Sequence, residues 1–180
     1  MRLDQFNNSA YQRGAPFLKE VLWYLVKMAF FTTRFPWADV WQCQLLRLFG
    51  AKVGKKVVIH PCVNITMPWN LELGDFVWIG EGVTILSLAP VQIQSHVCLS
   101  QEVYICTGNH DYRKQSFDLI VKPILIEEGV WVAARAFVGP GVSIGKNAVV
   151  TAGSIVKQSL PANMVCTGNP CDPIKRRYDK

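Results

Sequence analysis

His110 is the residue of this sequence best suited to acid–base chemistry, and it stands among polar neighbours in the segment Cys-Thr-Gly-Asn-His-Asp-Tyr (106–112). Histidine has an ordinary pKa near neutral, so it can take a proton from a hydroxyl group at physiological pH. Asn109, Asp111 and Tyr112 lie beside it and are candidate substrate-binding residues. A lone histidine is more often structural than catalytic, so its role depends on the element that holds it.

The other histidines and the cysteines offer two rival kinds of site. A zinc centre needs three converging histidines, but positions 60, 96 and 110 are separated by gaps of 36 and 14 residues, which do not stack on one edge of a repeating structure. The six cysteines form no CxxC pair and no Cys/His zinc spacing, so we expect free thiols in a reducing cytosol and no metal requirement. Cys106 could carry an acyl intermediate, although a cysteine in a β-rich segment is usually a small packing residue.

Composition and charge exclude some classes of protein. Half of the 180 residues are hydrophobic and 18% are charged, which excludes wholesale disorder and allows one domain with a buried core. The net charge of +6 suits an anionic ligand, a nucleic acid or an anionic membrane surface. The sequence has no arginine stripe interleaved with aromatic residues, so we do not expect a nucleic acid partner.

A six-residue period organises residues 51–160. A small or β-branched residue usually follows each repeated aliphatic residue after four positions. A period of six fits neither a helix, with about 3.6 residues per turn, nor a simple strand, with a period of about 2. It predicts short strands joined by tight turns, three to a coil, with the coils stacked as a solenoid. The repeated aliphatic residues are Val53, Ile59, Ile65, Leu73, Ile79, Ile85, Ile93, Leu99, Ile105, Ile126, Val132, Val138, Ile144, Val150 and Val156.

The period is interrupted once, between Ile105 and Ile126. The interruption predicts a loop of about residues 107–123 inserted into the rigid solenoid, with His110 at its root. Loops held by a rigid scaffold are where binding and catalytic residues concentrate. His110 is therefore the candidate base, whereas His60 and His96 lie within regular hexads and are expected to be turn or surface residues.

Residues 1–50 predict a helical segment, and residues 161–180 a C-terminal tail. The run from Phe17 to Phe31 is too short and too charged to span a membrane. A second helix is expected to start at Pro36, with Arg47 in its last turn and Gly50 after its end. These two amphipathic helices should cover an open end of the solenoid. The alternative is contact with a membrane face or a partner, which aromatic residues beside basic ones favour.

The repeat resembles that of the hexapeptide-repeat acyltransferases over roughly residues 50–175. The likeness is greatest to the maltose and galactoside O-acetyltransferases and to the colanic-acid acetyltransferase type. It implies a mainly β fold, a left-handed parallel β-helix of hexapeptide repeats with an N-terminal α-helical segment. It also implies direct transfer from acetyl-CoA to a hydroxyl. Besides the repeat, the likeness rests on residues 41–54, on CTGNHDY (106–112), on VKPILIEEGVWVAARAFVGPGVSIG (121–145) and on GNP (168–170).

The resemblance assigns roles to individual residues. His110 matches the catalytic histidine, while Ala134 and Ala152, eighteen residues apart, match the residues lining the pantetheine channel. The donor-site assignments are completed by Gly153, which allows close approach, and by Lys157, Lys175 and Arg176 near the nucleotide phosphates. Relatives often have Thr-Lys where this chain has Lys157-Gln158, so the phosphate contact could shift by one residue. The family forms trimers with the active site between subunits, so we expect a homotrimer.

The sequence does not identify the acceptor of the acetyl group. A carbohydrate is expected, and the preferred hypothesis is an exopolysaccharide or other surface-glycan precursor, modified while lipid-linked on the cytoplasmic side of the membrane. A free sugar or an antibiotic is an alternative acceptor. Two other readings compete with an acetyltransferase: a non-catalytic β-helix that serves as a structural or assembly module, and a zinc carbonic anhydrase, which uses the same β-helix.

Overall fold

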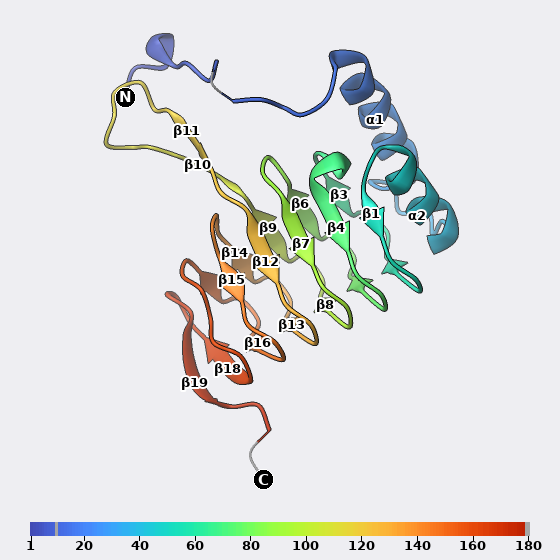
Figure 1. Cartoon of the computed structure of the whole chain (residues 1–180), viewed down its shortest axis with the longest axis vertical. Helices are drawn as coiled ribbons and strands as arrows, with labels where there is room; N and C mark the ends of the chain where they lie inside the picture. The colour runs from blue at the N-terminus through green and yellow to red at the C-terminus, as the bar shows by residue number, and fades with distance from the viewer. Residues whose placement is uncertain (10, 179–180) are drawn as a thin grey trace.

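The computed structural model describes residues 1–9 and 11–178 and consists of a parallel β-solenoid with two helices at one end (Figure 1). Three parallel sheets form its three faces. The first sheet comprises β1 (Lys52–Val53), β4 (Leu71–Leu73), β7 (Val91–Ile93), β12 (Ile124–Ile126) and β15 (Ser143–Ile144). The second comprises β2 (Val58–Ile59), β5 (Trp78–Ile79), β8 (Cys98–Leu99), β13 (Trp131–Val132), β16 (Val149–Val150), β18 (Met164–Thr167) and β19 (Asp172–Arg176). The third comprises β3 (Asn64–Ile65), β6 (Thr84–Leu86), β9 (Tyr104–Cys106), β14 (Phe137–Val138) and β17 (Ile155–Val156).

The pairing register of the parallel strands confirms that three hexads make one coil of the solenoid. Ile59 pairs with Ile79 and Val132 pairs with Val150, so each repeated aliphatic residue stacks on its equivalent in the next coil. All of these residues are buried except Val53, which is partly exposed. Burial of this aliphatic column is the main driving force for the fold.

Three edges of turns join the faces, and we number them by the sheets that they connect. The first edge joins the first sheet to the second (54–57, 74–77, 94–97, 127–130 and 145–148). The second edge joins the second sheet to the third (60–63, 80–83, 100–103, 133–136 and 151–154). The third edge joins the third sheet to the next coil of the first (66–70, 87–90, 107–123 and 139–142).

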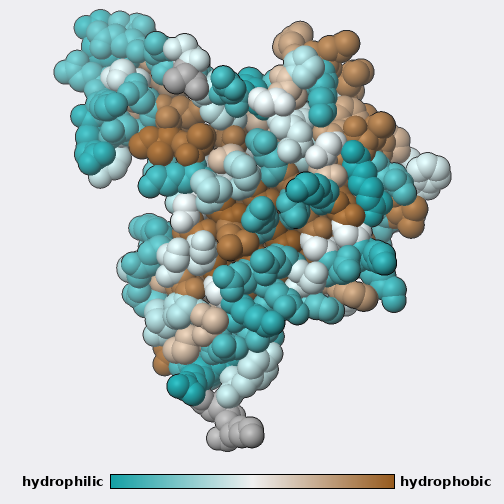
Figure 2. All heavy atoms as spheres, in the orientation of Figure 1, coloured by the Kyte–Doolittle hydropathy of each residue, from teal (hydrophilic) through white to brown (hydrophobic). Residues whose placement is uncertain are grey.

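The helices α1 (Phe17–Phe30) and α2 (Asp39–Leu48) pack on the first coil, which confirms the predicted cap. Trp23 and Leu46 are buried in the same hydrophobic core as the solenoid interior, and the Trp23 indole N–H donates to the Ile65 carbonyl at 3.0 Å. The outer face of α1 is different. It exposes the large apolar side chains of Phe17, Leu18, Leu22, Leu25 and Met28. Figure 2 shows a hydrophobic surface in the upper right region, where Figure 1 places α1.

Helix α2 begins at Asp39, so the predicted start at Pro36 is wrong by three residues. Trp37 stays outside the helix because its ring packs against Phe30 and Phe35, with ring centroids 4.8 and 4.6 Å apart. The Asp39 carboxylate accepts a hydrogen bond from the Ile59 backbone N–H at 2.9 Å and ties the start of α2 to the solenoid. The end of α2 is as predicted: Arg47 lies in the last turn, and Gly50 follows with φ of 99°.

The C-terminal segment is not a simple tail. β18 continues the second sheet in parallel, and β19 pairs with β18 in the antiparallel direction. Cys166 and Cys171 are buried here, and burial raises the pKa of the Cys166 thiol to about 11. All six cysteines are free, as predicted. Among residues 1–9 and 11–178, no helix is long and apolar enough to cross a membrane.

Candidate active site

His110 lies on a β-hairpin that projects from the third edge, between β9 and β12 (Figure 1). The hairpin is made of β10 (Gly108–His110) and β11 (Leu119–Val121), and His110 pairs with Leu119. Its root is closed by the Lys122 N–H, which donates to the Thr107 carbonyl at 2.9 Å. The solenoid then resumes in register, because β12 pairs directly with β7. The interruption of the sequence period is therefore an inserted hairpin with His110 in its first strand.

Phe117 holds the imidazole of His110 in two ways. The ring of Phe117 stacks on the imidazole with centroids 4.2 Å apart and planes 2° from parallel. The Phe117 carbonyl oxygen lies 2.8 Å from Nδ1 of His110. Because a carbonyl can only accept, Nδ1 carries the hydrogen and Nε2 carries the lone pair. Nε2 forms no hydrogen bond with the part of the chain that the structure describes.

The backbone of Phe117 is unusual for a bulky residue. Its φ is 53°, in the left-handed region that side chains other than Gly, Asn and Asp rarely adopt. The Phe117 N–H donates to the Lys114 carbonyl at 3.2 Å, and the Lys114 N–H donates to the Asp111 carbonyl at 3.1 Å. These two turns orient the Phe117 carbonyl toward His110. The same left-handed backbone occurs in turns of the solenoid, for example at Phe76 and His96, so the φ of Phe117 marks a tight turn and does not by itself indicate a functional site.

The three predicted substrate-binding residues have different surroundings. Asn109 is exposed, and its side-chain oxygen accepts from the His110 N–H at 2.8 Å. The Asp111 carboxylate accepts from the side chain and the backbone N–H of Arg113 at 3.1 and 3.2 Å, and this hydrogen bonding lowers the pKa of Asp111. Tyr112 is 83% exposed. Only Asn109 and Tyr112 therefore present side chains that are largely open to a ligand in this chain.

Cys106, the alternative nucleophile, directs its thiol toward the backbone of the nearby Gly108. It is buried at the end of β9, and its thiol lies 3.1 Å from the Gly108 carbonyl, to which it donates. A thiol so covered is poorly placed to attack a thioester, because the nucleophilic form must be exposed to its substrate.

The predicted donor residues Ala134 and Ala152 stack on the second edge. Ala134 follows β13 and Ala152 follows β16, and the two strands pair in register. The Gly153 N–H donates to the Ala134 carbonyl at 2.9 Å and joins the two turns. Gly153 has φ of 71°, and a Cβ at this position would meet nothing within 4 Å. At Ala134, Ala152 and Gly153 the second edge is therefore open and presents small residues, while the neighbouring Arg135 is paired with Glu102 at 2.6 Å.

The basic residues assigned to the nucleotide end are dispersed around the C-terminal end of the solenoid. Lys157 is exposed just after β17, and Lys175 is exposed on β19. Gln158, the residue that departs from the family pattern, donates to the Asp172 carboxylate at 2.9 Å. Arg176 lines a separate cavity of about 580 Å³ with residues 161–164 and Tyr178, at the first edge. Arg176 is thus not brought beside Ala152 within one chain.

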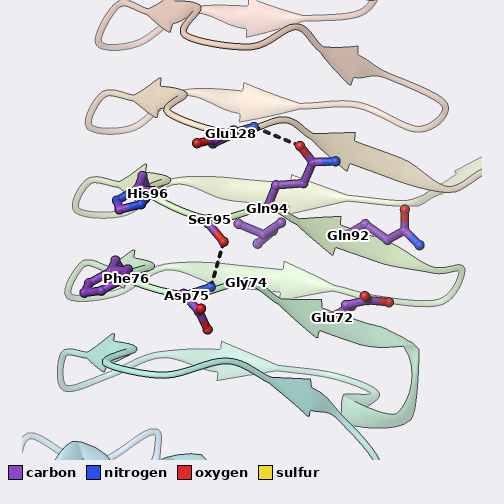
Figure 3. Close-up of a pocket in the computed structure, with 10 residues that line it drawn as sticks. Glu72, Gly74, Asp75, Phe76, Gln92, Gln94, Ser95, His96 and Glu128 are labelled. Atoms are coloured by element: carbon purple, nitrogen blue, oxygen red, sulfur yellow. Dashed lines mark hydrogen bonds between the residues drawn. The ribbon is translucent and has the colours of Figure 1, made fainter.

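A polar groove on the first edge and first sheet is a separate feature (Figure 3). Its volume is about 510 Å³, and His96 lies in it, stacked parallel on Phe76 with centroids 4.9 Å apart. Two of its carboxylates are paired with lysines at its rim: Glu72 with Lys52 at 3.2 Å and Glu128 with Lys146 at 2.9 Å. His96 and His60 are exposed turn residues, as predicted. Within the described residues, no three His, Cys, Asp or Glu side chains are grouped to hold a metal ion.

One chain does not bring the candidate base and the predicted donor residues together. His110 leaves the solenoid at the third edge, whereas Ala134 and Ala152 lie on the second edge, across the width of the third sheet. The sequence pattern located both groups but gave no sign of two further neighbours of His110. The Phe117 carbonyl is a backbone atom, and Phe6, whose ring centroid lies 5.8 Å from that of His110, is remote in the sequence.

The family "Bacterial transferase hexapeptide (six repeats)" matches residues 123–158. The candidate colanic acid biosynthesis acetyltransferase WcaF of Escherichia coli (strain K12) is 46% identical over 171 residues, which cover 93% of this chain and 92% of the relative. The galactoside O-acetyltransferase of the same organism is 31% identical over 140 residues, which cover 76% of this chain and 68% of the relative.

A solved structure has the same fold. The hexapeptide-repeat acetyltransferase VCA0836 of Vibrio cholerae O1 biovar eltor, in complex with acetyl coenzyme A, superposes with a TM-score of 0.80 at 26% identity. The superposition covers 90% of this chain and 88% of that chain. The similarity thus extends over the solenoid and most of the flanking segments.

Proposed function

Since this chain belongs to the hexapeptide-repeat acetyltransferases, we propose that it acetylates a sugar hydroxyl with His110 as the general base. It is an acetyl-CoA-dependent acyltransferase. Two of its relatives are named as acetyltransferases, and a similar solved structure is a complex with acetyl coenzyme A. The observation that carries the role of His110 is its 2.8 Å contact with the Phe117 carbonyl. This contact fixes the tautomer in which Nε2 is the free acceptor.

In the proposed reaction, Nε2 of His110 takes the proton of the acceptor hydroxyl while the hydroxyl oxygen bonds to the thioester carbonyl carbon. The tetrahedral intermediate collapses by cleavage of the C–S bond. The imidazolium then returns its proton to the sulfur, so that CoA leaves as the free thiol and the acetyl group stays on the sugar oxygen. Throughout, the Phe117 carbonyl accepts from Nδ1 and stabilises the positive charge of the imidazolium.

For the donor we propose the second edge. Ala134, Ala152 and Gly153 leave room for the pantetheine arm to approach backbone amides and carbonyls closely, because none of them projects a long side chain. The exposed Lys157, Lys175 and Arg176 are the proposed phosphate contacts, since a lysine binds phosphate as a compact point charge.

We also propose that the active site is completed in a homotrimer. His110 and the Ala134–Ala152 ledge lie at opposite margins of the third sheet, which supports a site shared between copies. In such a trimer the hairpin of one subunit faces the ledge of its neighbour. His110 then meets the thioester of an acetyl-CoA held by another chain.

The acceptor that we favour is a precursor of an exopolysaccharide or other surface glycan. This finer assignment is supported by the 46% identity to WcaF, a candidate enzyme of colanic acid biosynthesis. We propose a cytoplasmic location, at the inner face of the membrane. The apolar face of α1, with Leu18, Leu22 and Leu25 exposed, supports a peripheral contact that would bring the enzyme to a lipid-linked acceptor.

The test is release of CoA thiol from acetyl-CoA in the presence of a panel of glycosides, with p-nitrophenyl β-D-galactoside as reference acceptor. His110→Ala should lower kcat by about 10²- to 10⁴-fold, the usual contribution of a general base. His96→Ala is the matched control, because His96 is stacked on Phe76 at the first edge. Cys106→Ala should retain activity if the transfer is direct. Unchanged activity of His110→Ala would refute the role of His110 as the general base. Absence of acetyl-CoA binding to the wild-type protein would favour a non-catalytic structural module.

A further inference from the structure

The N-terminal arm, residues 2–9 and 11–15, runs back along the third edge to the hairpin that carries His110 (Figure 1). It is fixed at both ends. Near α1, the Tyr11 hydroxyl donates to the Leu88 carbonyl at 2.8 Å, and the Trp69 indole N–H donates to the Arg13 carbonyl at 2.7 Å. At the far end, the Arg2 backbone N–H donates to the Gln115 carbonyl at 2.7 Å. The arm therefore bridges the first coil and the hairpin.

Phe6 brings an aromatic ring from this arm to the candidate base. Its ring centroid lies 5.8 Å from that of His110, with the planes inclined by 56°. One face of the imidazole is already covered by Phe117, which stacks on it at 4.2 Å. Phe6 is still 38% exposed, so part of its ring remains available to a ligand beside His110. Two aromatic rings therefore adjoin the imidazole: Phe117 is stacked on it, and Phe6 is tilted toward it and partly exposed.

The nearby part of the third edge is apolar as well. Gly108 precedes His110 by two residues, and a Cβ at Gly108 would lie 2.9 Å from a methyl group of Leu88 and 3.7 Å from one of Leu86. Both leucines are partly exposed at this edge. A sugar ring has the matching chemistry, since its C–H faces are apolar and its rim of hydroxyls is polar. Small polar ligands are commonly held by apolar and aromatic walls with a few placed hydrogen-bonding groups.

We propose that Phe6 forms a wall of the acceptor site, packs against the sugar ring and holds the reacting hydroxyl at Nε2 of His110. This inference rests on the proposed function. It makes Phe6 a specificity-determining residue that acts on the acceptor and not on acetyl-CoA. By lying beside the imidazole, Phe6 would also limit the access of water to it.

The kinetic test compares wild type with Phe6→Ala, Phe6→Trp and Phe35→Ala, using p-nitrophenyl β-D-galactoside. Phe6→Ala should raise the acceptor KM by about tenfold, as expected for loss of one aromatic packing contact. It should leave the KM for acetyl-CoA unchanged and increase thiol release in the absence of acceptor. Phe6→Trp should restore the acceptor KM. Phe35→Ala is the matched control, because Phe35 is an exposed aromatic residue packed on Trp37, away from the hairpin.

A second measurement follows the histidine ring protons by NMR. Removal of the Phe6 ring current should shift the His110 signals in Phe6→Ala, while those of His60 and His96 serve as internal references. An acceptor KM within twofold of wild type, or His110 signals that do not move, would overturn the assignment of Phe6. If His110→Ala stays active, or no glycoside is acetylated, the proposed function fails and the acceptor wall fails with it. The NMR comparison still decides whether Phe6 covers His110.

Discussion

Nδ1 of His110 and the carbonyl oxygen of Phe117 lie 2.8 Å apart, and the rings of the same two residues stack in parallel at 4.2 Å. One residue thus fixes both the tautomer and the orientation of the imidazole. The carbonyl is aimed by a backbone with φ of 53°, which makes the conformation of Phe117, and not only its side chain, part of the site. This dependence can be tested by substitutions that separate backbone from ring.

The loss of kcat caused by a substitution at Phe117 should therefore depend on whether the new residue can adopt the positive φ of this position. Phe117→Gly loses the stacked ring but adopts a positive φ without strain, so the carbonyl stays in place and kcat should fall by only about tenfold. Phe117→Pro cannot reach this φ, since the pyrrolidine ring fixes it near −65°. Its carbonyl turns away, and kcat should fall by about 10²-fold or more, close to His110→Ala. Steady-state kinetics would contradict the assignment if Phe117→Gly were as damaged as Phe117→Pro while both remained folded by circular dichroism.

The ledge on the second edge makes a prediction for the donor. Ala152→Leu should place a bulky side chain over the open space beside Gly153 and raise the KM for acetyl-CoA by at least about tenfold. Because Ala152 is exposed, the melting temperature should change little. The matched control is Lys55→Leu, an exposed position on the first edge. Equal acetyl-CoA affinity in Ala152→Leu, measured by isothermal titration calorimetry, would remove the second edge as the pantetheine channel.

A shared site predicts complementation between two impaired variants, assayed at an acetyl-CoA concentration well below the raised KM of Ala152→Leu. If His110 of one subunit serves acetyl-CoA on the next, mixed trimers of His110→Ala and Ala152→Leu contain some sites with an intact base and an intact ledge. Random assembly of equal amounts should restore about a quarter of the wild-type sites overall, and about a third of them in the purified mixed trimers. Co-expression with two affinity tags, followed by sequential purification and thiol release, measures this. A mixed trimer as inactive as its parents would mean that each chain uses its own ledge.

The sequence predicted the repeat far better than the surroundings of the base. The aliphatic residues that recur every six positions are nearly all buried, because side chains at this spacing can only meet their equivalents one coil away. The loss of the six-residue period between Ile105 and Ile126 identified the inserted hairpin, because residues outside the coils do not have to stack in this way. By contrast, the Phe117 carbonyl leaves no trace in residue type, and the approach of Phe6 to His110 depends on how residues 7–9 and 11–15 cross the third edge. The start of α2 was wrong by three residues, because the sequence did not reveal that Trp37 packs on Phe30 and Phe35 outside the helix.

The exposed face of α1 predicts binding to membranes. Leu18, Leu22 and Leu25 lie on one side of this helix and are 68%, 47% and 58% exposed, while its other side packs on the first coil through Trp23. The net charge of +6 favours an anionic surface, so the protein should sediment with vesicles containing phosphatidylglycerol more than with vesicles of phosphatidylcholine alone. Replacing Leu22 and Leu25 by Glu should lower the bound fraction by roughly tenfold or more, since each buried leucine contributes about 1.5–3 kcal/mol. The matched control is Ile174→Glu, an equally exposed apolar residue on β19 at the opposite end of the solenoid. If the double variant binds vesicles as wild type does, or wild type binds neither kind, α1 is only a cap and a lipid-linked acceptor must reach His110 by another route.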